Sequence, residues 1–125
     1  GHQFLRHLAR TRLLLHLVDL APLHPDTDPV REARAILNEL KKYDEELYNK
    51  PRWLVLNKLD LLEDKEEKVA AFLREFGSHT RHFAISAING EGCRELTYAI
   101  MEHLEQAAKE EQSVIAENPQ ESDAV

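Results

Sequence analysis

Apolar residues follow two different spacings along this chain, and the spacings alternate. A nearly continuous apolar run at 13–18, interrupted only by His16, predicts a buried β-strand that is covered on both faces as in a parallel sheet, and two further short strands are predicted at 52–56 and 82–85. Between and after them, apolar residues recur at helical spacing over 29–43, 65–76 and 91–108, and a further helical stretch at 3–10 precedes the first strand. Strands that alternate with helices predict right-handed crossovers, so we expect an α/β fold with a parallel three-stranded sheet and flanking helices.

Several residues mark the ends of these helices. Asp28 is a candidate N-cap, with Pro29 in the first helical position. Asp64, followed by Glu67, has the spacing of a capping box. Gly77 is a candidate C-cap. We expect the helix at 91–108 to be buried through its apolar positions, Leu96, Ile100 and Leu104.

Length and composition restrict the class of protein. The 125 residues suit one domain, predicted at 1–108, followed by an acidic tail at 109–125 that we expect to be disordered. The net charge of −7 argues against a general nucleic-acid binder. A single cysteine, Cys93, rules out an internal disulfide and fits a reducing, cytoplasmic setting. The seven histidines show no metal-binding spacing, so no metal site is expected.

Two short motifs lie directly after the second and third predicted strands. Residues 57–60 read N-K-L-D, and residues 86–88 read S-A-I. Ligands of open parallel sheets bind at the carboxyl ends of the strands, where these two motifs must meet. The pair is typical of the guanine-reading half of a GTPase, so we expect a guanine-nucleotide site here.

The central residue of that site is Asp60. Guanine presents a ring N–H beside an exocyclic NH₂, and one carboxylate can accept both hydrogen bonds. Adenine lacks this pair of donors, so Asp60 predicts discrimination between the two bases. The hydroxyl of Ser86 is expected to hold the Asp60 carboxylate in place.

The neighbouring residues complete the predicted site. The apolar stem of Lys58 can lie along a base face while its ammonium reaches toward the sugar. Asn57 can tie the two loops together and also meet the base, and the backbone N–H of Ala87 can meet the guanine carbonyl. The predicted guanine-nucleotide-binding residues are therefore Asn57, Lys58, Asp60, Ser86, Ala87 and Ile88.

Simpler interpretations remain open. Asn and Asp are frequent in turns, so N-K-L-D can be an ordinary turn after a strand. Asp19 ends the first predicted strand, and with a lysine and a serine it suggests a phospho-receiver site. The order of Lys58 and Ser86 along the chain does not suit a receiver, and we expect Asp19 only to order its own loop.

A phosphate-binding loop is missing from the sequence. No G-x-x-x-x-G-K-[ST] segment occurs in the 125 residues. We therefore expect this chain to be part of a GTP-binding domain without its catalytic portion, with no catalytic and no metal-binding residue of its own. On its own it is expected to be inactive and to bind nucleotide very weakly, because most affinity for such nucleotides comes from contacts to the phosphates.

The same residues resemble a known family. The opening 1–8, G-H-Q-F-L-R-H-L, and the later L-H-L-V-D at 15–19 look like the stretch after switch II in the Obg (CgtA) GTPases of bacteria. Residues 57–60 match that family's fourth G motif, and 86–92 match its fifth. These two motifs are shared by many GTPases, whereas the opening segment points to Obg. The resemblance covers about 1–106.

The resemblance implies a three-layer P-loop NTPase fold, of which this chain is the C-terminal half of the G domain. For the whole protein it implies GTP hydrolysis to GDP, Mg²⁺ as a cofactor and action in large ribosomal subunit assembly. Nothing here matches the P-loop, the switch I threonine, the D-x-P-G of switch II or the glycine-rich N-terminal domain. Other readings are another bacterial ribosome-assembly GTPase, or a non-enzymatic α/β interaction or receiver-like module.

The resemblance also bears on association. In that fold the first strand, 13–18, pairs with the P-loop strand, and without that neighbour its edge is open and apolar. Exposed strand edges favour pairing with another chain. We therefore expect the chain either to cover this edge, by self-association through edge pairing or by exchange of the helix at 3–10, or to be only marginally stable.

Overall fold

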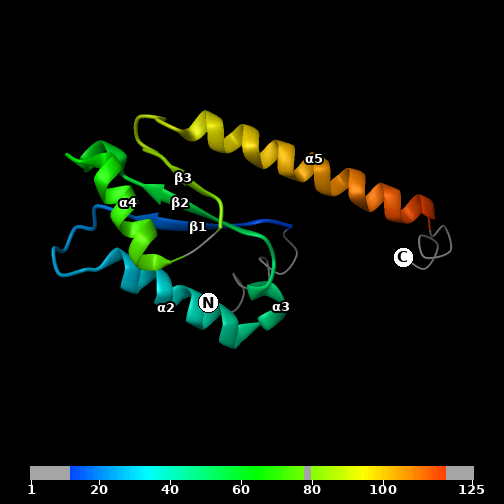
Figure 1. Ribbon diagram of the computed structural model, residues 1–125, viewed down its shortest axis with the longest axis horizontal. Coiled ribbons are helices and arrows are strands. Elements are labelled where there is room, and N and C mark those ends of the chain that lie inside the picture. The colour runs from blue at the N-terminus through cyan, green and yellow to red at the C-terminus, as the bar shows by residue number, and fades with distance from the viewer. Residues whose placement is uncertain (1–11, 78–79, 118–125) are drawn as a thin grey trace. The chain divides into compact units, whose positions relative to one another are not determined.

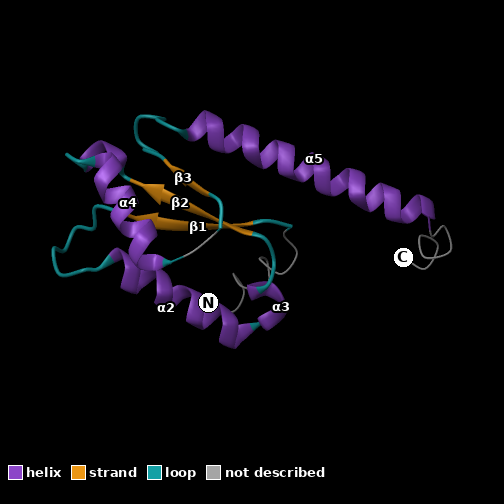
Figure 2. Cartoon of the chain, viewed as in Figure 1, coloured by secondary structure: helices purple, strands orange, loops and turns teal. Residues whose placement is uncertain are grey.

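The computed structural model, which describes residues 12–77 and 80–117, contains a parallel three-stranded sheet (Figures 1 and 2). The strands are β1 (Leu14–Asp19), β2 (Arg52–Asn57) and β3 (His82–Ala84), in the spatial order β1-β2-β3. Both pairs of neighbouring strands are parallel. The predicted α/β fold is confirmed. The helix predicted at 3–10 and the end of the acidic tail lie outside the described residues.

The helices alternate with the strands as the spacing predicted. They are α2 (Pro29–Tyr43), α3 (Glu45–Tyr48), α4 (Lys65–Phe76) and α5 (Cys93–Glu117), and a 3₁₀ turn, η1 (Leu59–Leu61), follows β2. The sequence did not predict α3 or η1, because an element of one turn is too short to show a hydrophobic period.

The helix ends follow local chemistry in two of three predicted cases. The Asp28 side chain accepts a hydrogen bond from the N–H of Val30 at 3.0 Å, with Pro29 in the first turn. Gly77 ends α4 in the left-handed conformation, with φ of 72°. The capping box predicted at Asp64 is wrong, since its side chain makes no capping bond and only its carbonyl oxygen accepts from the N–H of Lys68.

The main core lies on one face of the sheet. Helices α2 and α4 pack side by side there, and both supply apolar side chains. The buried members of this cluster are Val18, Val30, Ala33, Leu54, Leu56 and Phe72. This packing holds β1 and β2 in the register that sets Asp19 beside Asn57, so the loops after the strands begin at a common edge.

The opposite face of β1 differs from the prediction. Burial alternates strictly along this strand, and Leu15 and Leu17 are 39% and 62% exposed. The sequence shows a nearly continuous apolar run at 13–18, interrupted only by His16, and therefore predicted cover on both faces. Within residues 12–77 and 80–94, side chains cover only one face of β1.

Helix α5 is longer than predicted. The chain divides into two compact units, Gly1–Arg94 and Glu95–Val125, and most of α5 lies in the second. Residues 109–117 continue the helix, whereas the sequence placed them in a disordered tail. Gln, Ala, Lys and Glu favour helices, and Gln106 donates to Glu110 one turn later at 3.5 Å, which explains the extension. Leu104, expected to be buried, is 41% exposed. The domain boundary after residue 108 stays a prediction.

No described helix is both long and apolar enough to cross a membrane.

A buried histidine lies in the core face of β1. His16 is 7% exposed and meets the ring of Phe76 edge-on, with the ring centroids 6.2 Å apart. Neither of its ring nitrogens has a hydrogen-bond partner within the described residues. Burial, and after it the nearby charge of Arg52, lowers the pKa of His16 from 6.5 to about 4.

This histidine should make folding sensitive to mild acid. Between pH 6.5 and about 4 the unfolded chain binds a proton that folded His16 does not, so its contribution to stability is complete above pH 6.5 and declines toward pH 4. The loss should reach roughly 2–3 kcal/mol near pH 4.5. Urea unfolding of the wild type and His16→Leu at pH 7 and 4.5 measures it. His16→Leu should lose this part of the pH dependence, whereas His82→Gln, at an exposed strand position, should keep it.

Candidate functional site

The loops after the three strands are joined by backbone hydrogen bonds. The N–H of Leu20, after β1, donates to the carbonyl of Asn57 at 3.2 Å. The N–H of Leu59, after β2, donates to the carbonyl of Ile85 at 3.2 Å. Leu59 is also buried, which anchors the 3₁₀ turn that carries Asp60. The carboxyl edge of the sheet is therefore one connected surface rather than three independent loops.

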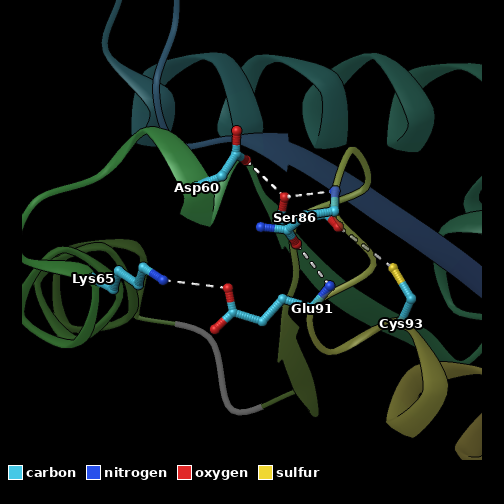
Figure 3. Close-up of polar contacts among 6 residues, drawn as sticks. Asp60, Lys65, Ser86, Glu91 and Cys93 are labelled. Carbon is cyan, nitrogen blue, oxygen red and sulfur yellow. Dashed lines mark hydrogen bonds and ion pairs between the residues drawn. The ribbon is translucent and has the colours of Figure 1, made fainter.

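Asp60 and Ser86 meet across this edge, as the sequence predicted (Figure 3). The hydroxyl of Ser86 donates to Oδ1 of Asp60 at 2.8 Å. Ser86 is completely buried, whereas Asp60 is exposed. A carboxylate has about four acceptor positions, so one bond from Ser86 fixes the group and leaves room for two further donors.

Asn57 connects the two motifs. Its Oδ1 accepts from the N–H of Lys58 at 2.7 Å and from the N–H of Ala87 at 3.0 Å. The loop-tying contact predicted for Asn57 is present. The N–H of Ala87, predicted to meet a guanine carbonyl, is here donated to Asn57. It can meet a ligand as well only by sharing its proton between two acceptors.

Lys58 has an unusual backbone and an unpredicted partner. Its φ is 75°, and it is the one non-glycine residue with positive φ among those described. Its ammonium lies 2.7 Å from Oδ2 of Asp19, whereas the sequence placed it toward a sugar. Oδ1 of Asp19 accepts from the N–H of Ala21 at 2.8 Å, which confirms its predicted loop-ordering role. The sequence analysis considered Asp19 because it ends a strand, but it did not predict the ion pair with Lys58.

The loop from Ser86 to Cys93 is folded tightly on itself. The N–H of Ser86 donates to the carbonyl of Glu91, and the N–H of Gly90 donates to the carbonyl of Ser86, both at 2.9 Å. Gly92 has φ of 75°, and a Cβ there would collide with the carbonyl oxygen of Ala84. At the surface, Lys65 from α4 pairs with Glu91 at 3.3 Å (Figure 3). These contacts fix the direction in which Ser86 points.

The remaining predicted residue is Ile88, which is 84% exposed. It follows Ala87 in the loop, and it has no part in the contacts described above for Asn57, Lys58, Asp60 and Ser86. No group of three or more His, Cys, Asp or Glu side chains is placed to hold a metal ion within 12–77 and 80–117.

Comparisons with known proteins agree with the fold. No known protein family's sequence profile matches the chain. Among solved structures, the chain is similar to a nucleolar GTP-binding protein 1 from Plasmodium falciparum, with a TM-score of 0.56 and 18% sequence identity. The alignment covers 98% of this chain and 62% of that chain, so this chain spans less than two thirds of its structural neighbour. A likeness at this level of identity shows a shared α/β fold.

Proposed function

We propose that this chain binds the base of a guanine nucleotide at the carboxyl edge of its sheet, through Asn57, Lys58, Asp60, Ser86, Ala87 and Ile88. The observation that carries the proposal is the hydrogen bond of 2.8 Å from buried Ser86 to Asp60. It presents an exposed carboxylate in a fixed orientation, and that group is complementary to the paired donors of guanine.

The backbone of Lys58 supports the same proposal. A non-glycine residue in the left-handed region costs about 1 kcal/mol or more, and such residues cluster at functional sites. Here the conformation is maintained by Asn57, which accepts the N–H of Lys58. An ordinary turn would not need this strain, because Gly or Asn would form it at lower cost.

The whole protein is, on this proposal, an Obg-type GTPase that hydrolyses GTP to GDP in the cytoplasm during large ribosomal subunit assembly. Support comes from the sequence resemblance at 1–8, 57–60 and 86–92, and from the structural neighbour, which is named a GTP-binding protein. Mg²⁺ and the phosphates would be bound by other parts of that protein. We assign no catalytic or metal-binding residue to this chain.

The base-binding proposal is tested by NMR titration of the ¹⁵N-labelled chain, which detects millimolar affinities. Guanosine is expected to shift the amide signals of Lys58, Asp60 and Ala87, and adenosine at the same concentrations is expected to leave them unchanged. Guanosine carries no phosphate, so its binding measures recognition of the base alone. Contacts to phosphates are not expected from this chain. Equal responses to the two nucleosides, or none to guanosine, would refute the proposal.

The ion pair between Asp19 and Lys58 favours one alternative, a receiver-like module. A strand-end aspartate beside a lysine meets one part of what phosphorylation of the carboxylate would require. Incubation with acetyl phosphate and Mg²⁺, followed by mass spectrometry, distinguishes the two functions. A phosphorylated Asp19 would support the receiver-like module, whereas a guanosine-specific response supports base binding.

We also propose that the chain associates with a second copy through β1. Within the described residues, β1 is at the end of the strand order, and exposed Leu15 and Leu17 add an apolar face beside that edge. An unprotected apolar strand edge is a template for pairing. The net charge of −7 opposes association, so we expect a weak dimer that dissociates on dilution.

Light scattering over a dilution series measures this association. The mean mass should rise with concentration for the wild type, and Leu17→Lys should remain a monomer at about tenfold higher concentration, because a charge beside the edge blocks pairing. Leu23→Lys is the matched control, since Leu23 is 92% exposed in the loop after β1. A wild type that stays monomeric at every concentration would show that the edge is protected within the chain.

A further inference from the structure

Asp19 lies one strand away from the proposed base-binding motif, and its carboxylate has two separate contacts. Oδ1 accepts from the N–H of Ala21 at 2.8 Å, and Oδ2 lies 2.7 Å from the ammonium of Lys58. Sheet register sets this distance, because Asp19 is the partner of Asn57, the residue before Lys58. The carboxylate is therefore oriented by its own loop before it meets the lysine.

Lys58 is consequently held at both ends. Its backbone N–H is bound by Asn57 and its φ is fixed at 75°, while its ammonium is bound by Asp19. The four-carbon stem between these points is apolar and spans the strand ends of β1 and β2. A free lysine has many rotamers, and ordering them on ligand binding reduces affinity. A lysine that is tethered in the folded chain has lost most of that freedom already.

We infer that Asp19 is a positioning residue, which tethers Lys58 so that its aliphatic stem forms a preformed wall for the face of the purine. The inference rests on the proposed base-binding function. It assigns different tasks to the two aspartates of the site: Asp60 distinguishes between bases, and Asp19 strengthens binding of any base that Asp60 accepts. Contact of a methylene stem with a ring face does not depend on the ring substituents, so its contribution is independent of base identity.

A surface ion pair without a functional role is the competing explanation. The side chains of Lys58 and Asp19 are 33% and 42% exposed, and pairs of this kind contribute little to stability. Asp19→Asn separates the explanations, because an asparagine Oδ1 can still accept from Ala21 while the charge that holds Lys58 is lost. Asp26→Asn is the control, with the same change in charge at an exposed position of the same loop.

The test is guanosine titration of the chain by NMR, with the dissociation constant as the result. Asp19→Asn is expected to weaken guanosine binding by about three- to tenfold, the size expected when one lysine regains part of its rotamer freedom. Asp26→Asn should not change it. In a Lys58→Met background, which keeps an apolar stem but has no ammonium, Asp19→Asn should have no further effect. A structural role of Asp19 alone would not produce that dependence on Lys58.

Two further measurements complete the test. Xanthosine binding to the Asp60→Asn variant should weaken when Asp19→Asn is added, by the same factor as guanosine binding to the chain with Asp60. The ¹³Cε relaxation of Lys58 without ligand should show an ordered side chain in the wild type and a mobile one in Asp19→Asn. Unchanged or tighter guanosine binding by Asp19→Asn would overturn this inference alone. A wild-type chain that binds no guanosine would overturn the proposed function, and the relaxation data would still show whether the tether exists.

Discussion

Asp60→Asn is expected to exchange a preference for guanosine for a preference for xanthosine. The asparagine Oδ1 can still accept from Ser86, which leaves an NH₂ group facing the ligand where a carboxylate oxygen stood. Xanthosine has a carbonyl in place of the exocyclic amine of guanosine, and this carbonyl can accept a hydrogen bond from the asparagine NH₂. In guanosine the exocyclic amine is itself a donor, so the two NH₂ groups would face each other without a hydrogen bond. The ratio of the two affinities should change by about 100-fold or more, since unpaired polar groups typically cost a few kcal/mol.

Competition between guanosine and xanthosine, followed by NMR, measures that ratio. Asp64→Asn is the matched control, because Asp64 is exposed shortly after Asp60 and its side chain makes no capping bond. Ser86→Ala should weaken guanosine binding without creating xanthosine binding, since the carboxylate remains but its orientation is no longer fixed. If Asp60→Asn keeps its preference for guanosine, Asp60 does not read the base.

Gly92→Ala is expected to destabilise the fold by about 4 kcal/mol. Its φ of 75° costs an L-residue about 1–2 kcal/mol, and the added Cβ would collide with the carbonyl oxygen of Ala84. That carbonyl belongs to β3, so relief requires movement of backbone rather than rotation of a side chain, which typically costs a further 1–3 kcal/mol. Urea unfolding of the variant and the wild type measures the difference.

Gly90→Ala is the comparison that isolates the collision. Gly90 also has positive φ, 85°, but nothing lies within 4 Å of the position that its Cβ would occupy. It should therefore cost only about 1–2 kcal/mol. Similar losses for the two variants would show that backbone conformation, and not contact with Ala84, makes glycine necessary at position 92.

Much of the fold was predictable because strands and helices leave different periods in a sequence. The three strands and the long helices follow from apolar spacing, and Asp28 and Gly77 mark helix ends by local chemistry. The candidate site was also predictable in outline, since parallel strands bring the loops after β2 and β3 to one edge. The capping box at Asp64 failed because a matching pattern does not ensure that the side chain bonds the helix.

The sequence by itself determined the fold class and the sheet edge that carries both motifs, since periods, turn residues and motif spacing can be identified along the chain. It also predicted the pairing of Ser86 with Asp60, because parallel strands bring the loops after β2 and β3 to one edge. Tertiary structure alone decided the ion pair of Asp19 with Lys58, the bond of Asn57 to Ala87 and the glycine needed at 92. It also decided that one face of β1 is covered and buries His16 while the other exposes Leu17. These features depend on strand register and on which helices pack against which face, and neither is visible in the spacing of residues along one chain.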